Sequence, residues 1–260
     1  MTVRDLDQPR GWAFGLAVAV MKPTLLAVSK RVWIDGEKIP ASGGCVVVLN
    51  HVSHIDPMMA GHFLYDHGRM ARYLAKAGLF SNKFLRTFLN SAGQIPVARQ
   101  TADAVGAYTA AVQAVREGQC VVVYPEGTIT RDPGLWPMTG KSGAARIALE
   151  TRCPVIPVAH WGVQDVLAPY GHRVHVIPRR TVTVKAGDPV DLDDLLALPE
   201  KERLSLQSVQ TATDRVMAAI TGLLEDIRGE TAPAERFDPR KAGVSMTGNP
   251  HKQQKKGKDN

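Results

Sequence analysis

Two continuous valine-rich runs constrain the fold of this chain more than any other feature. CVVVLN at 45–50 and CVVVY at 120–124 are of strand length, and neither alternates between apolar and polar residues. Such runs are typical of strands that a parallel sheet buries on both faces. Other candidate strands are VWID at 32–35, RYLA at 72–75, QIPV at 94–97, PVIPVA at 154–159, and RVHVI with TVTVKAG over 173–187.

Segments with helical periodicity separate several of these runs. In the segment 103–117 the apolar residues form one stripe, Thr101 can cap the helix, and Gly118 can end it. Its return into the second valine-rich run predicts a βαβ crossover. We therefore expect an α/β fold with a mostly parallel central sheet flanked by helices. The other predicted helices are 55–66, 83–91, 142–150 and a late outer helix over 203–228.

The first 30 residues are mostly apolar but are interrupted by Lys22-Pro23. Neither apolar piece reaches the ~20 residues that span a bilayer. Three interpretations compete: a secretory signal, a helix of the core, and a helix or helix pair lying in the membrane interface. Acidic residues near the start weaken the first. Tryptophans flanked by basic residues favour the third: Trp12, Trp33, Lys22, Lys30 and Arg31.

We expect three parts: a membrane-associating segment over 1–30, a folded domain over 31–229, and a basic disordered tail over 230–260. The tail has few apolar residues. The net charge of +7 predicts an acidic partner, which would be nucleic acid, an anionic membrane surface or a phosphorylated substrate. The three cysteines lie beside apolar residues without CxxC spacing, which favours buried thiols and a cytosolic compartment.

The stretch NHVSHIDP, at 50–57, directly follows the first valine-rich run. On one continuous helix His51 and Asp56 would lie ~140° apart. If His51 instead lies in a turn and the helix begins near Ser53, the carboxylate can fold back and orient the imidazole as a base. The alternative is that Ser53 caps the helix, Asp56 complements its dipole, and the histidines are incidental. A zinc site lacks further clustered ligands, so we expect no metal.

Two further polar clusters follow predicted strands. Glu126-Gly127-Thr128 come after the second valine-rich run, and Arg131 and Lys141 lie close behind. A glycine at such a turn lets backbone amides approach an anion, although a polar surface loop has the same composition. Arg99 follows QIPV and is either a phosphate ligand or a solvated side chain.

Taken in order, four blocks resemble the glycerophospholipid acyltransferases, and most of all the bacterial PlsC-like 1-acylglycerol-3-phosphate acyltransferases. The resemblance implies the glycerolipid acyltransferase fold. It also implies transfer of a fatty acyl group from an acyl-coenzyme A or acyl-carrier-protein thioester to the free hydroxyl of lysophosphatidic acid, without a cofactor. The blocks are N-H-x4-D at 50–56, K-x19-P-V-x-R at 76–99, Y-P-E-G-T at 124–128 and V-I-P-V at 155–158.

Carried onto this sequence, the resemblance makes His51 the general base and Asp56 its orienting partner. Glu126, Gly127 and Thr128 would help to hold the acceptor, and Arg99 would bind its phosphate. The V-I-P-V block would line the site or an acyl channel.

One residue departs from the family pattern, which commonly has arginine directly after E-G-T. Here that residue is Ile129, so Arg131 or Lys141 would take the charge, and glycerol 3-phosphate or a glycolipid hydroxyl stays open as the acceptor. We expect a peripheral or monotopic enzyme at the cytoplasmic face of the cell membrane. Its partners would be a lysophospholipid, an acyl thioester and the anionic membrane surface, with no nucleic acid. The alternatives from other classes are a basic nucleic-acid or anionic-surface binding module and a non-catalytic membrane-surface protein.

Overall fold

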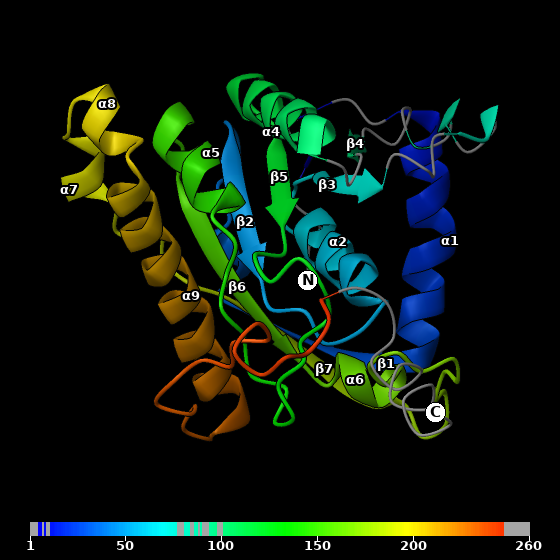
Figure 1. Cartoon of the computed structure of the whole chain (residues 1–260). Helices are drawn as coiled ribbons and strands as arrows, with labels where there is room; N and C mark the ends of the chain where they lie inside the picture. The colour runs from blue at the N-terminus through cyan, green and yellow to red at the C-terminus, as the bar shows by residue number, and fades with distance from the viewer. Residues whose placement is uncertain are drawn as a thin grey trace.

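The computed structural model describes residues 5–6, 8, 11–76, 81–83, 86–87, 89, 94–97 and 101–246. It is an α/β fold in which one seven-stranded sheet is flanked by helices (Figure 1). The predicted helix 83–91 falls largely outside the described residues, as does the side chain of Thr101. The elements are α1 (Trp12–Val28), β1 (Ser29–Ile34), η1 (Gly36–Lys38), β2 (Cys45–Leu49), α2 (Asp56–Asp66), β3 (Ala71–Lys76), β4 (Ile95–Val97), α4 (Thr101–Arg116), β5 (Cys120–Val123), α5 (Gly143–Thr151), β6 (Val155–Trp161), α6 (Val163–Val166), β7 (Arg180–Ala186), α7 (Asp193–Leu196), α8 (Glu200–Arg203) and α9 (Leu206–Arg228).

The sheet is mostly parallel, as predicted. Its strands lie in the order β1-β7-β6-β2-β5-β3-β4, and each neighbouring pair is parallel except β6 with β7. The two valine-rich runs are adjacent central strands, with Cys45 opposite Cys120 and Val48 opposite Val123. Their carboxyl ends therefore lie together, which is where open α/β sheets place their sites.

The valine-rich strands are buried because both faces of the sheet are covered. Val46 and Val48 of β2 pack in one core cluster with residues of α5 and α9. Val47 and Leu49 point the other way and pack in a second cluster with residues of α2. This alternation follows from the two-residue period of a strand, and it explains the continuous apolar run.

Helix α1 is a single helix, and Pro23 lies inside it. It contacts α2 and β1 and lies at the opposite side of the molecule from α8 (Figure 1). Across the described residues, no helix is both long and apolar enough to cross a membrane.

The predicted strand RVHVI, at 173–177, is wrong. These residues form an exposed loop whose only ladder contact among the described residues is an isolated bridge between Leu167 and Val174. Only the second half of that predicted segment, Arg180–Ala186, is a strand. The alternating pattern was present, but no neighbouring strand pairs with it.

The late part of the chain differs from the prediction in two ways. The predicted helix 203–228 is α9, which begins three residues later at Leu206, because Ser205 caps it by accepting a hydrogen bond from the Ser208 amide, and Arg203 ends the short helix α8 instead. The tail was expected to be disordered from residue 230, whereas residues 230–246 pack against the domain. The Phe237 carbonyl accepts from the Thr139 amide, and Pro239 is buried. Residues 247–260 lie outside the described part of the chain.

Candidate active site

The turn between β2 and α2 holds His51 just outside a helix. Helix α2 begins at Asp56, one residue after the predicted start at 55, and Pro57 follows within its first turn. Proline suits this position because the first amides of a helix have no partner within the helix. His51 therefore lies in the turn and Asp56 in the helix, which is the arrangement that the sequence required for contact.

The Asp56 carboxylate organises this turn. Its Oδ2 atom accepts from the amides of Val52 and Ser53 at 2.6 and 2.8 Å, and it lies 2.8 Å from His51 Nδ1. Asp56 is fully buried, whereas 17% of the His51 side chain is exposed. An ionised carboxylate only accepts, so Nδ1 is the donor of this contact. In a neutral ring Nε2 is then the nitrogen that can accept a proton.

The loop after β5 clamps the backbone of His51 from both sides. Glu126 is fully buried, its Oε1 accepts from the His51 amide at 2.9 Å, and its Oε2 accepts from the Met138 amide at 3.0 Å. In return the His51 carbonyl accepts from the Thr130 amide at 2.8 Å. Burial raises the pKa of Glu126 to about 8, although the two backbone amides act to lower it. In this structure Glu126 positions His51.

His160, in strand β6, lies behind the His51–Asp56 pair. It is fully buried, and its Nε2 lies 3.7 Å from Asp56 Oδ2. Among the described residues neither ring nitrogen has a hydrogen-bond partner, and desolvation lowers the pKa of His160, which favours the neutral ring. Asn50 accepts from the His160 amide and donates to its carbonyl, both at 3.0 Å. These two bonds join the end of β2 to β6 directly beside His51.

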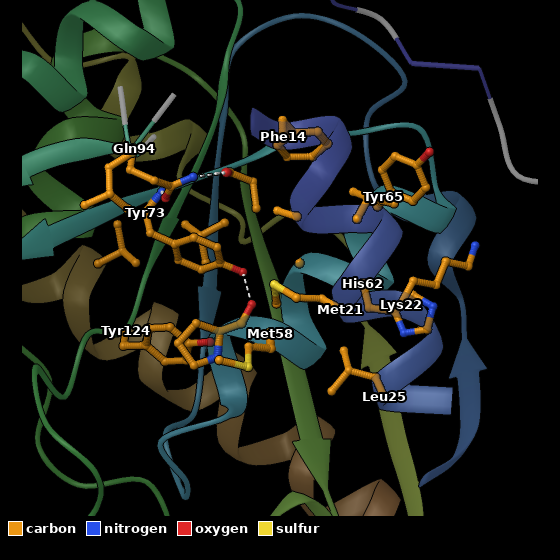
Figure 2. A pocket seen from close by; sticks show the side chains of 18 of the residues that line it. Phe14, Met21, Lys22, Leu25, Met58, His62, Tyr65, Tyr73, Gln94 and Tyr124 are labelled. Atoms are coloured by element: carbon orange, nitrogen blue, oxygen red, sulfur yellow. Dashed lines mark hydrogen bonds between the residues drawn. The ribbon is translucent and has the colours of Figure 1, made fainter. Parts of the chain in front are cut away.

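A cavity of about 640 Å³ opens beside His51 and runs between α1, α2 and β3. Most of its lining is apolar side chains. Figure 2 shows Tyr73 and Tyr124 at one end and Lys22, His62 and Tyr65 at the other. A volume in the range of ~300–1,000 Å³ is typical of ligand sites.

Two tyrosines form the cavity wall next to His51. The Tyr124 ring lies 4.5 Å from the His51 ring between centroids. The Tyr73 hydroxyl donates to the Pro57 carbonyl at 2.6 Å, as the dashed line in Figure 2 shows. Burial raises the pKa of both tyrosines, so both phenols stay protonated. His51 therefore faces an aromatic, largely apolar wall.

A buried charge cluster closes the far end of the cavity. The Asp66 carboxylate on α2 accepts from Lys22 on α1 at 2.7 Å and from Arg31 and Trp33 on β1 at 2.6 and 3.0 Å. Arg31 also lies 3.0 Å from His62 Nε2. Desolvation lowers the pKa of His62 to about 4. We call Lys22, Arg31, Trp33, His62 and Asp66 the Asp66 cluster.

Lys141 is the cation that the structure brings next to the Gly127 turn. Gly127 lines the cavity with a φ of 71°, and a Cβ placed on it would meet Lys141 Nζ at 2.5 Å. The positive φ favours glycine at this position, and the Lys141 ammonium lies close to its Cα. Arg131 is 9% exposed, and its guanidinium lies 4.6 Å from the centroid of the Tyr170 ring.

The structure brings together five of the predicted site residues: His51, Asp56, Glu126, Gly127 and Lys141. Thr128 is half-buried beside Tyr170, 3.5 Å from its hydroxyl, and Arg99 lies outside the described residues. The V-I-P-V block, residues 155–158, is buried in β6 and does not line the cavity. No role was predicted for Tyr124 or His160, although Tyr124 opens the Y-P-E-G-T block and His160 directly follows the predicted strand PVIPVA.

The comparisons with known proteins agree with this geometry. A family model described as Acyltransferase matches residues 31–161. A 1-acyl-sn-glycerol-3-phosphate acyltransferase of Bacillus subtilis is 28% identical over 65% of this chain and 78% of that relative. One of Borreliella burgdorferi is 27% identical over 76% of this chain and 75% of that relative.

The fold is also similar to that of a solved structure. The crystal structure of the 1-acyl-sn-glycerophosphate (LPA) acyltransferase PlsC from Thermotoga maritima matches with a TM-score of 0.61 at 22% identity, over 85% of this chain and 81% of that chain.

Proposed function

Because this chain belongs to the acyltransferase family, we propose that it acylates the free hydroxyl of 1-acylglycerol 3-phosphate from an acyl thioester to form phosphatidic acid. The observation that carries the proposal is the His51–Asp56 pair, which lies at the mouth of an apolar cavity. The names of the relatives from Bacillus subtilis and Borreliella burgdorferi support the choice of acceptor.

The chemistry needs one base and one positioned acceptor. His51 Nε2 takes the proton of the acceptor hydroxyl as its oxygen attacks the thioester carbonyl. The carbon–sulfur bond then breaks, an oxygen ester forms, and the proton passes to the departing thiolate. A thioester is already activated, so neither a covalent acyl-enzyme nor a cofactor is required. Asp56 keeps the imidazole in the tautomer that can accept, and it stabilises the imidazolium that forms.

Lys141 is the group that we assign to the acceptor phosphate among the described residues. Its ammonium lies against Gly127, which lines the cavity together with His51, whereas the predicted alternative Arg131 is stacked on Tyr170. Ile129, which replaces the usual arginine, is 2% exposed and cannot bind the acceptor phosphate. Another residue must therefore supply the positive charge. Arg99 remains a proposed second phosphate ligand.

Helix α1 supports a peripheral position on the membrane. One of its faces lines the cavity with Phe14, Val18 and Met21. The opposite face is exposed and almost wholly apolar, and its members recur at helical spacing: Trp12, Leu16, Ala19, Val20, Pro23 and Ala27. A helix that is apolar on both sides suits an enzyme whose cavity takes a lipid chain out of a bilayer. We place the enzyme at the cytoplasmic face.

The proposal is tested by incubating the purified protein with lysophospholipids of different head groups and with acyl-coenzyme A or acyl-carrier protein. Products are identified by mass. We expect phosphatidic acid from lysophosphatidic acid. Acylation of lysophosphatidylcholine or glycerol 3-phosphate alone would overturn the assigned acceptor.

Two histidine variants provide the internal control for this assay. His51→Ala should lose turnover about 10²- to 10⁴-fold, since it removes the base. His54→Ala should keep it, because His54 is exposed and its ring packs against Tyr170. Equal turnover in the two variants would refute His51 as the base.

A further inference from the structure

The loop between α6 and β7 exposes an unusual combination of side chains. Val174, Val176 and Ile177 are 51%, 45% and 88% exposed. Arg173 and Arg179 flank them and are also exposed, and residues 173–180 contain no acidic side chain. We call residues 173–180 the apolar–basic loop. A single exposed β-branched side chain is common on protein surfaces. Three within four residues form an apolar patch, and such patches mark sites that bind a membrane or another protein.

Hydrogen bonds and a β-bridge hold both ends of this loop, and the bond at its second end comes from the guanidinium of Arg179. The His175 amide donates to the Val166 carbonyl at 2.8 Å, and Leu167 bridges Val174. At the other end Arg179 donates to the carbonyl of Ser29 at 2.6 Å. The tip is therefore presented by ordered flanks and does not pack on the core.

The same contacts place the loop at the carboxyl end of α1. Ser29 directly follows α1, and in the sheet it pairs with Arg180, the residue that ends the loop. Figure 1 shows the loop below the lower end of α1, on the side of the molecule away from α8. The exposed apolar face of α1 and the loop thus belong to one side of the protein.

We propose that the apolar–basic loop is a second membrane-contact element, which inserts Ile177 and its valine neighbours below the head groups of an anionic bilayer. Arg173 and Arg179 then lie at the level of the lipid phosphates. The inference rests on the proposed function, since it concerns how that enzyme sits on its substrate's membrane. Together α1 and the loop give two contacts, which fix the orientation of the cavity better than one helix does.

The chemistry of the loop favours a bilayer over the other anionic partner, nucleic acid. Single-stranded nucleic acid is bound by aromatic side chains on which bases stack, and the loop has none. An isoleucine that is almost fully exposed gains nothing from a phosphate backbone. In the acyl region it gains the transfer free energy of its side chain, while each nearby arginine adds attraction to anionic lipid.

The test is co-sedimentation of the full chain with phosphatidylcholine vesicles that contain 0 or 30% phosphatidylglycerol, a composition chosen for the assay. Ile177→Asp should weaken partitioning at least about tenfold. Arg173→Gln should weaken it about fivefold, and only on the anionic vesicles. Leu206→Asp is the matched control and should bind like wild type, because Leu206 is 82% exposed on the far side of the molecule at the start of α9.

Turnover on lysophosphatidic acid in detergent micelles separates this inference from the proposed function. Ile177→Asp should keep wild-type turnover there. Loss of turnover in micelles, equal vesicle binding by Ile177→Asp and Leu206→Asp, or a loop-dependent preference for DNA would each overturn the membrane role. If wild type binds vesicles through the loop but acylates none of the lysophospholipids, the proposed function fails and the surface stands. If wild type acylates lysophosphatidic acid in micelles but does not bind vesicles, the membrane role of the loop fails and the proposed function stands.

Discussion

The two sides of His51 are built by different interactions. On the sheet side, the buried Asp56 and Glu126 side chains bond to His51, and the Asn50 amide joins the end of β2 to β6 beside it. On the cavity side, α1 packs through apolar side chains, and its charged contact with the domain is Lys22 in the Asp66 cluster. We refer to these two regions as the catalytic corner and the α1 wall.

This difference separates two tasks of the molecule. Proton transfer demands a fixed tautomer and a fixed ring orientation, which directional hydrogen bonds from a rigid sheet provide. Apolar packing has no such direction, so a wall made of it can adjust to lipid chains of different shape. We therefore expect changes in the catalytic corner to affect turnover, and changes in the α1 wall to affect stability and substrate affinity.

The largest effect should follow Asp56→Asn. The oxygen that replaces Oδ2 can still accept from the Val52 and Ser53 amides and from His51 Nδ1, but the side chain no longer carries the negative charge that would stabilise the imidazolium formed in the reaction. We expect kcat to fall about 10²- to 10⁴-fold with little change in KM. Steady-state kinetics measure this, and Asp188→Asn, which alters only an exposed ion pair with Lys38, is the control. A KM effect without a kcat effect would remove Asp56 from the catalytic corner.

Glu126→Ala should act mainly through the fold. It leaves the buried amides of His51 and Met138 without their acceptors, which costs about 1–3 kcal/mol each. We expect the free energy of unfolding to fall by about 2–4 kcal/mol and kcat to fall about tenfold. If Glu126 instead only contacts the acceptor, KM rises and denaturant unfolding is unchanged. Glu235→Ala, at an exposed position, is the control.

Asp66→Asn tests the α1 wall. The change weakens the contacts of Lys22, Arg31 and Trp33 with one side chain that is 5% exposed. We expect a loss of about 1–3 kcal/mol in the free energy of unfolding, since the two cations are themselves partly exposed. KM should rise while kcat changes less than about threefold. Asp226→Asn, in an exposed pair with Lys185, should change stability by less than about 0.5 kcal/mol. A fall in kcat as large as that of Asp56→Asn would contradict the separation of the two regions.

The catalytic corner was more predictable from sequence than the α1 wall. His51 and Asp56 are five residues apart, so helix geometry alone limited the ways in which they meet. The sheet followed from the valine-rich runs for a similarly local reason. Glu126 was assigned to the acceptor because sequence gives no sign that its side chain turns back under His51. That contact depends on β2 and β5 being neighbours.

The features that were predicted wrongly, or not at all, depend on contacts between residues far apart in the sequence. RVHVI has the alternation of a strand, but whether a strand forms depends on a free edge beside it. The Asp66 cluster joins α1, β1 and α2, and no spacing connects Lys22 or Arg31 to Asp66. The packing of 230–246 depends on single residues such as Phe237 in an otherwise polar stretch.

The smallest predicted effect concerns His62, a residue of the α1 wall that makes the free energy of unfolding depend on pH. Its pKa is about 4 in the folded protein because burial disfavours the charged ring, and Arg31 and Lys22 oppose charging further, while Asp66 acts in the other direction. In the unfolded chain the pKa returns to about 6.5, so the unfolded state binds more protons between these values. The stabilising effect of the neutral ring is thus present above pH 6.5 and is lost as the pH falls toward 4.

Between pH 7 and pH 5 we expect wild type to lose on the order of 1–2 kcal/mol more than His62→Phe, which keeps a ring against Trp33 but cannot titrate. Denaturant unfolding at both pH values measures the difference, and His175→Gln, at an exposed histidine, should behave like wild type. Identical pH dependence in wild type and His62→Phe would mean that the cluster accommodates a charged ring, and that the α1 wall does not loosen in acid through His62.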